Sequence, residues 1–291
     1  MLLKADAQAG RVQPSSPLIF LHLPKTAGVT LNTVIHRQYD PSQIYEIYGN
    51  QPEKRAEAFL RMPHEERMRC RCIAGHMRYG VHTGLTPPWY YITVLREPVA
   101  RLVSEYYYIL QRPNHWFHRT VRDRGLALDT FAVHAPNIIA NAQTMLLAGV
   151  PPGISPTDAD VDTAYARLRD EFAVFGRNDR FDEFLVLCRQ QLGWSNVCYT
   201  RLNVTLGRTS RRTLTVAQRQ AIEEACRFDM ALYQKASALW EERIDSMGQR
   251  FQEDVRRYKR LNRLYQTAYR AQRSLHMCGR AFFSGKLARN R

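Results

Sequence analysis

Short apolar runs alternate with amphipathic segments along much of the chain. Leu18 to Leu21 (Leu-Ile-Phe-Leu) and Tyr90 to Leu95 are uninterrupted apolar or β-branched runs, a pattern typical of strands buried on both faces of a parallel sheet. Residues 72–74 and 172–175 are shorter strand candidates. Because predicted strands repeatedly alternate with helices, the sequence predicts an α/β fold, with a central, mostly parallel sheet between two layers of helices.

Helical spacing of apolar residues predicts the elements between the strands. The first helix is expected over residues 30–38, with Thr30 as its N-cap, and another runs from Pro98 to about Leu110. Further helices are expected over residues 51–69, 137–147, 158–170, 181–192, 216–227 and 230–242. Residues 113–135, rich in His, Arg and aromatic side chains, are predicted to be irregular.

Three regions follow from this pattern: a flexible N-terminus (1–17), one domain (18–250) and a basic helical tail (251–291). The formal charge is +15, but residues 255–291 hold eleven Lys and Arg and no acidic residue. The preceding residues carry 31 basic and 27 acidic groups, and this uneven distribution weakens the inference of a nucleic-acid partner from the total charge.

The basic tail has apolar residues that approximate one helical face. These residues are Phe251, Val255, Tyr258, Tyr265 and Tyr269. The pattern predicts either a helix docked on the domain with a solvated basic face, or a patch that contacts an anionic acceptor, polymer or membrane surface.

Compartment and metal content are also constrained by composition. No apolar run approaches the roughly 20 residues that span a bilayer, and Met1 to Pro17 lacks the apolar stretch of a signal peptide. We therefore expect a cytoplasmic protein, with peripheral attachment to a membrane left open. The six scattered cysteines predict free thiols. No His, Cys, Asp or Glu cluster has metal-ligand spacing, so no metal is expected.

The first candidate site is the loop from Leu23 to Thr30, between a buried strand and a helix N-terminus. Backbone N–H groups and the helix dipole favour an anion there. Lys25 adds a positive charge, Thr26 and Thr30 add hydroxyl groups, and Gly28 permits close backbone approach. The loop is not a Walker A sequence, since Lys25 precedes the glycine. An ordinary turn with an exposed lysine is the alternative.

The second candidate site follows the strand that ends at Leu95. Arg96 lies at the carboxyl end of this strand, where open α/β sheets bind ligands, and Ser104 lies about two turns into the next helix. Both side chains could hold one phosphate group. The alternative is a surface Arg96 paired with Glu97 and a serine packed in its helix.

Together, the two segments resemble the nucleotide-binding elements of sulfotransferases that use 3′-phosphoadenylyl sulfate (PAPS). Phe20 to Leu31 resembles the 5′-phosphosulfate loop, and Val94 to Tyr107 resembles the 3′-phosphate element, in which an Arg and a Ser eight positions apart hold that phosphate. The residues of these two segments are most similar to those of the heparan and uronyl 2-O-sulfotransferases. The nucleotide-binding residues that the resemblance implies are Lys25, Thr26, Ala27, Gly28, Val29, Thr30, Arg96 and Ser104.

This resemblance covers residues from about Leu18 to Arg243 and implies a P-loop-like fold. There are departures from the family pattern. Ala27 stands where Gly or Ser is frequent, Val29 where Thr or Ser is frequent, and Asn178 where an acidic residue is usual. Val29 removes one hydroxyl group from the loop, while the backbone donors remain.

A histidine between these elements is the candidate base. Ala74 to Tyr79 resembles the Gly-His segment that supplies a catalytic histidine in the 2-O branch, which implies this role for His76. A histidine with a pKa near 6.5 is largely neutral at pH 7 and can remove a hydroxyl proton. His82 is the second candidate, and His22 is expected to pack or orient the loop. A turn-capping role for His76 is the alternative.

The expected reaction is in-line transfer of the sulfuryl group from PAPS to a hydroxyl of a carbohydrate or glycoconjugate. Lys25 and the loop N–H groups would stabilise charge on the leaving phosphate. Residues 114–119 are a candidate acceptor surface, with core packing of Trp116 and Phe117 as the equal alternative. The loop of residues 203–213 is basic and carries Arg208, Arg211 and Arg212. Arg211 or Arg212 would close over the nucleotide, and a solvated loop is the equal alternative.

Two other functions stay open from the sequence. A P-loop-related nucleotide kinase would need a Walker lysine and a magnesium-holding acid, and neither is apparent. A non-catalytic protein could instead bind nucleic acid, an anionic polymer or a membrane through the tail.

Overall fold

A five-stranded parallel sheet forms the centre of the protein, in the order β2-β3-β1-β4-β5. The computed structural model describes residues 16–49, 51–200 and 214–287, with side chains as far as residue 272. The strands are β1 (Leu18–Leu21), β2 (Ile44–Ile47), β3 (Cys72–Gly75), β4 (Tyr90–Leu95) and β5 (Phe172–Arg177). The predicted α/β, P-loop-like fold with a parallel sheet is confirmed.

The strand register brings the expected ligand-binding ends together. Strand β1 pairs with β3 and with β4 in parallel, with Leu21 opposite Gly75 and Leu18 opposite Tyr90. The residues that follow β1, β3 and β4 therefore leave the sheet at the same edge. We refer to this edge as the carboxyl edge.

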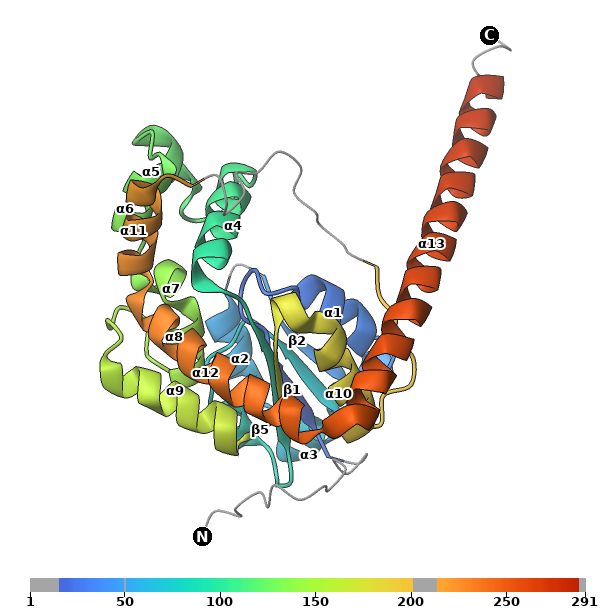
Figure 1. Cartoon of the computed structure of the whole chain (residues 1–291), viewed down its shortest axis with the longest axis horizontal. Helices are drawn as coiled ribbons and strands as arrows, with labels where there is room; N and C mark the ends of the chain where they lie inside the picture. Colours follow the sequence, from blue (N-terminus) through green and yellow to red (C-terminus); the bar gives the residue numbers. More distant parts are fainter. Residues whose placement is uncertain (1–15, 50, 201–213, 288–291) are drawn as a thin grey trace.

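Helices cover both faces of the sheet, as a three-layer fold requires (Figure 1). The α-helices are α1 (Gly28–Ile35), α2 (Pro52–Arg61), α3 (His64–Arg69), α4 (Pro98–Leu110), α5 (His118–Asp123), α6 (Leu128–His134), α7 (Asn137–Ala140), α8 (Ala142–Ala148), α9 (Asp158–Asp170), α10 (Phe181–Leu192), α11 (Val216–Ala225), α12 (Arg227–Ser246) and α13 (Gly248–Leu287). Short 3₁₀ helices are η1 (Pro41–Gln43), η2 (Val81–Gly84) and η3 (Asn178–Arg180). Helices α1 and α10 lie on one face, and α8, α9 and α12 lie on the other. Trp240 of α12 packs on Phe175 of β5, with 5.9 Å between ring centroids.

The segment predicted to be irregular, residues 113–135, instead contains α5 and α6. These helices pack with α4 and α11 around a second apolar cluster that includes Phe117, Val121 and Phe131. The prediction was wrong because helices of six and seven residues are too short to show a clear periodicity. Their stability comes from distant partners rather than from their own sequence.

Two helix boundaries also differ from the sequence prediction. Helix α1 begins at Gly28 with Ala27 as its N-cap, so Thr30 lies inside the helix. The single helix expected over 137–147 is interrupted at Asn141. The buried Asn141 side chain donates to the Ala225 carbonyl and accepts from the Asp229 backbone N–H, which ties the break to the start of α12.

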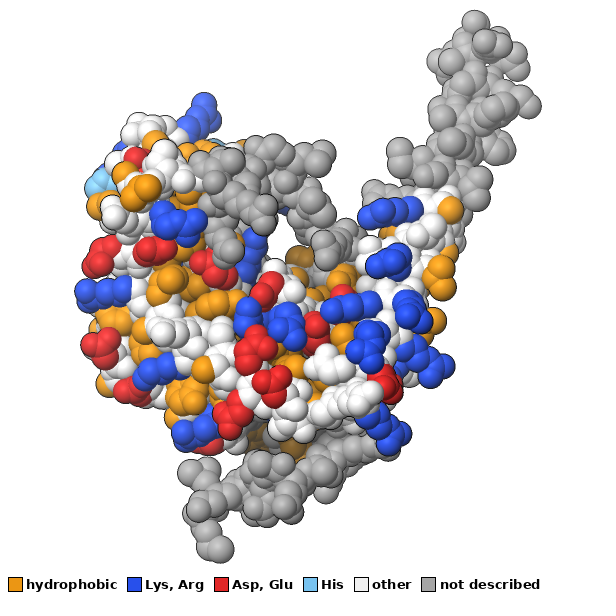
Figure 2. All heavy atoms as spheres, in the orientation of Figure 1, with side chains coloured by type: hydrophobic (Ala, Val, Ile, Leu, Met, Phe, Trp, Pro, Cys, Tyr) orange, Lys and Arg blue, Asp and Glu red, His pale blue; other side chains and the backbone are white. Residues whose placement is uncertain are grey.

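The first part of the basic tail is a docked helix, whereas Tyr269, farther along the predicted apolar face, is 39% exposed. Helix α13 begins at Gly248, and Phe251, Val255 and Tyr258 are buried in the main core. The Tyr258 hydroxyl donates to the Val197 carbonyl at 2.8 Å. Basic side chains gather on the outer surface of this helix (Figure 2). The exposed ones are Arg256, Arg257, Lys259, Arg260, Arg263 and Arg270.

The cysteines agree with the expectation of free thiols. Free cysteines occupy positions 70, 72, 188, 198 and 226, while the Cys278 side chain lies outside the described part. Burial raises the pKa of the Cys226 thiol to about 12, so this thiol stays protonated near neutral pH. Within the described residues, no helix combines the length and apolarity needed to cross a bilayer.

Candidate functional site

The turn between β1 and α1 has an unusual backbone conformation. Lys25 and Ala27 have φ angles of 65° and 74°, in the left-handed region that residues with a side chain rarely adopt. They are the only described non-glycine residues with positive φ. No described side chain caps α1, and its first turn holds no acidic residue. The turn therefore presents helix N-terminal N–H groups to an anion, and its strained backbone is typical of a binding site.

The side chains of this turn divide between structure and site. Thr26 is buried, and its hydroxyl donates to the Leu23 carbonyl at 2.8 Å. That hydrogen bond stabilises the turn, so we expect Thr26 to meet an anion through its backbone N–H. Thr30 is buried in the first turn of α1, while Val29 is half exposed. The hydroxyl that the family pattern has at position 29 is therefore missing from an accessible position.

Gly28 is required by a close contact with His22. A Cβ atom at position 28 would lie 1.7 Å from Nε2 of His22, well inside any van der Waals contact. The His22 ring is buried and its Nδ1 lies 3.0 Å from the Tyr48 hydroxyl. Burial, with the nearby positive charge of Lys25 and the neighbouring His76, holds the pKa of His22 well below its usual value. His22 thus packs under the loop, as the sequence suggested.

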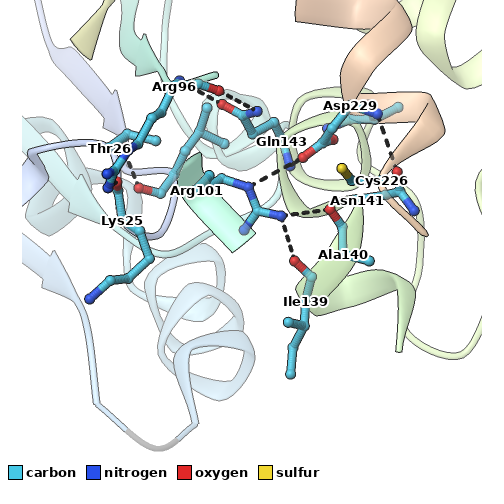
Figure 3. Close-up of polar contacts among 12 residues, drawn as sticks. Lys25, Thr26, Arg96, Arg101, Ile139, Ala140, Asn141, Gln143, Cys226 and Asp229 are labelled. Carbon is cyan, nitrogen blue, oxygen red and sulfur yellow. Dashed lines mark hydrogen bonds and ion pairs between the residues drawn. The ribbon is translucent and has the colours of Figure 1, made fainter. Parts of the chain in front are cut away.

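Arg96 joins the two predicted binding segments (Figure 3). Its guanidinium donates to the Lys25 carbonyl at 2.8 Å. Its own backbone is held from both sides by Gln143, whose Oε1 accepts from the Arg96 N–H at 2.9 Å and whose Nε2 donates to the Arg96 carbonyl at 3.0 Å. The Glu97 carboxylate caps α4 by accepting from the Ala100 N–H at 2.8 Å. Ser104 is buried on the same helix.

A buried ion pair, missed by the sequence analysis, supports this arrangement. Arg101 of α4 and Asp229 of α12 are both fully buried, with 3.4 Å between Nε and Oδ2. The Arg101 guanidinium also donates to the carbonyls of Ile139 and Ala140 at 2.6 Å each. Asp229 accepts the Thr144 N–H at 2.7 Å. The network fastens α4 to α7, α8 and α12 (Figure 3).

His76 leaves β3 at the carboxyl edge with a defined tautomer. Its Nδ1 lies 2.8 Å from the His22 carbonyl oxygen. A carbonyl only accepts, so Nδ1 carries the hydrogen and Nε2 of the neutral ring has the lone pair. Burial and the positive charge of Lys25 lower the pKa of His76, against the opposing effect of this hydrogen bond. Near neutral pH, His76 is therefore an uncharged ring whose Nε2 can accept a proton.

The second candidate base, His82, lies elsewhere. Its Nδ1 is 3.1 Å from the Tyr91 hydroxyl, and its ring packs against Trp89. Tyr91 lies near the start of β4 and Leu95 at its end; four residues of strand separate them by about 13 Å. The structure thus places His82 towards the opposite edge of the sheet from the β1–α1 turn.

The candidate acceptor segment splits between its two alternatives. Phe117 is 8% exposed and belongs to the second apolar cluster, whereas Trp116 is 64% exposed. The Lys25 ammonium lies 3.8 Å above the Tyr108 ring of α4.

The late basic loop lies outside the described residues, with Arg208 and with Arg211 and Arg212, one of which was proposed from the sequence to close over the nucleotide. Among the residues that are described, no group of three or more His, Cys, Asp or Glu could hold a metal ion.

Comparison with known proteins now connects this geometry to a family. The family model described as Galactose-3-O-sulfotransferase matches residues 3–276. The chain belongs to the galactose-3-O-sulfotransferase family. The predicted membership among carbohydrate sulfotransferases is confirmed. The matched family is named for galactose 3-O-sulfation, whereas the two nucleotide segments resemble most closely those of the 2-O-sulfotransferases.

Two mammalian relatives give the same assignment. Galactose-3-O-sulfotransferase 3 of Bos taurus is 27% identical over 258 residues, which cover 79% of this chain and 58% of the relative. The protein of the same name from Mus musculus is 26% identical over 260 residues, covering 79% of this chain and 57% of that relative. The chain therefore matches somewhat more than half the length of these relatives.

Proposed function

We propose that this protein transfers the sulfuryl group of PAPS to a hydroxyl of a galactose-containing carbohydrate acceptor. The observation that carries the proposal is the joining of both nucleotide segments by the hydrogen bond from Arg96 to the Lys25 carbonyl. Family membership and the neutral His76 nearby support it.

The chemistry of the turn fits an anionic nucleotide donor. The N-terminus of α1 offers uncapped N–H groups, which suit a phosphosulfate. The planar guanidinium of Arg96 and the hydroxyl of Ser104, on the following helix, suit the 3′-phosphate. The donor supplies an activated sulfuryl group whose leaving group is a phosphate.

The chain's own residues then account for the transfer. Nε2 of His76 takes the proton of the acceptor hydroxyl while the acceptor oxygen bonds to sulfur and the sulfur–oxygen bond to the phosphate breaks. The electron pair of the broken bond stays on the phosphate, where Lys25 and the α1 N–H groups stabilise the negative charge. Most of the rate enhancement would come from positioning and electrostatics.

Transfer from radiosulfate-labelled PAPS to a β-galactoside tests this proposal. The matched acceptor is the same galactoside methylated at O3, which should accept no sulfate if the reaction follows the family name. Equal labelling of both acceptors would contradict 3-O specificity. Absence of transfer with intact binding of the desulfated donor would contradict the galactoside acceptor, and absence of donor binding would contradict the nucleotide site.

Family membership favours sulfuryl transfer over the nucleotide-kinase alternative. Contact of the tail with an anionic surface stays a prediction, as does a cytoplasmic location.

A further inference from the structure

A row of rings leads from the nucleotide loop along the end of α4. The Lys25 ammonium lies 3.8 Å above the centre of the Tyr108 ring. The His115 ring meets Tyr108 edge-on, with 6.0 Å between centroids, and Trp116 lies 5.8 Å from His115 at an interplanar angle of 28°. These contacts place Trp116 on a continuous surface with Lys25.

His115 is held rigidly beneath this tryptophan. Its Nδ1 accepts the backbone N–H of Phe117 at 3.2 Å, so Nε2 of the neutral ring carries the hydrogen. That nitrogen lies 3.7 Å from Oε1 of Glu105, a buried carboxylate on α4. The hydrogen bond at Nδ1 sets the orientation of the His115 ring, on which Trp116 stacks.

The exposure of Trp116 has no structural explanation within the described residues. Its side chain is 64% exposed, while the next residue, Phe117, is 8% exposed and anchors the segment in the second apolar cluster. A large aromatic face that is both rigid and open to solvent is suited to the apolar C–H face of a pyranose ring.

The distance from the reaction centre determines which sugar could bind. The contacts run from Lys25 to Tyr108, from Tyr108 to His115 and from His115 to Trp116, with ring-centroid spacings of 6.0 and 5.8 Å in the last two steps. Trp116 therefore lies beyond the ring that touches Lys25, in a position suited to a sugar next to the reacting galactose. We propose, on the basis of the proposed function, that Trp116 stacked on His115 binds a sugar one or two units inward from the galactose that reacts. The site therefore selects oligosaccharides over single galactosides.

Acceptor-length kinetics test this subsite. Wild type, Trp116→Ala and Trp116→Phe are compared on a methyl galactoside and on a tetrasaccharide that ends in galactose. Val133→Ala on α6, also at an exposed apolar position, is the control variant. We expect Trp116→Ala to lose about tenfold in kcat/KM on the tetrasaccharide, with an unchanged value on the methyl galactoside. Trp116→Phe should retain most of the tetrasaccharide activity.

The outcomes separate this inference from the proposed function. Wild-type transfer to both acceptors with no selective loss in Trp116→Ala would overturn the subsite and leave the proposed function standing. Equal losses on the two acceptors would also overturn it, since they would indicate a structural role for Trp116. Loss of association with another protein in place of a loss of kcat/KM would assign the exposed ring to a protein interface. Failure of wild type on every galactoside would overturn both proposals.

Discussion

Replacing Asp229 by alanine tests whether the buried ion pair holds the wall of the site in place. The change leaves the Arg101 guanidinium fully buried without its charge partner and removes the acceptor of the Thr144 and Gln143 N–H groups. Removing one partner of a buried ion pair lowers the free energy of unfolding by about 3–5 kcal/mol. The Thr144 and Gln143 N–H groups also lose their acceptor, which adds to this loss. We expect a loss of about 4 kcal/mol in the free energy of unfolding, measured by urea denaturation.

Two matched variants separate charge burial from a general effect of alanine. Asp170→Ala removes the partner of Arg169 from a half-exposed pair with an N–O distance of 2.7 Å and should cost less than about 1 kcal/mol. Replacing both members of the buried pair, as Arg101→Met with Asp229→Leu, should be less damaging than Asp229→Ala alone. The reasoning is refuted if Asp229→Ala costs no more than Asp170→Ala, or if the double variant is the less stable of the two.

Three further predictions concern the site itself. His76→Gln should lower kcat by about 10²–10⁴-fold with little change in calorimetric binding of the desulfated donor. Since the neutral ring is the active form and its pKa is lowered from 6.5, wild-type kcat/KM should reach its plateau on the alkaline side and fall to half of the plateau only at a pH below 6.5; a midpoint above pH 7 would exclude this base. Arg96→Ala should weaken binding of the desulfated donor more than binding of AMP, which lacks the 3′-phosphate; equal losses would argue against the assignment. Gly28→Ala should cost activity and stability through the clash with the His22 ring, and adding His22→Ala should restore thermal stability by relieving it.

Strands buried on both faces were readable from the sequence because each residue faces an apolar layer. β1 and β4 have the bounds predicted for them. Strand β2 was missed because it is an edge strand in which Glu46 is exposed, so four residues show neither a continuous apolar run nor a full alternation. Helices α5 and α6 were missed for a related reason, since the cluster that stabilises them is assembled from distant segments.

The candidate site was predictable where it depends on strand ends. Lys25, His76 and Arg96 each follow a strand of the parallel sheet, so the topology alone predicts that they share one edge. The pattern could not reveal that Gln143 clamps the Arg96 backbone or that Asp229 pairs with Arg101. A buried polar residue has a partner by physical necessity, but the identity of that partner depends on the complete fold.

Helix α4 has a consequence for how acceptor preference could change among related enzymes. Arg96 lies two residues before it and Tyr108 lies near its end, so the thirteen residues of the helix, about 20 Å long, set the position of Tyr108 relative to the Arg96 backbone. Deleting one residue from α4 would shorten the helix by about 1.5 Å and rotate the residues after the deletion by about 100° about the helix axis. Tyr108 would then no longer lie beneath the Lys25 ammonium. Insertions and deletions should therefore be confined to residues 111–117, after the helix. There they would move the exposed aromatic surface without changing the position of Tyr108 relative to Lys25.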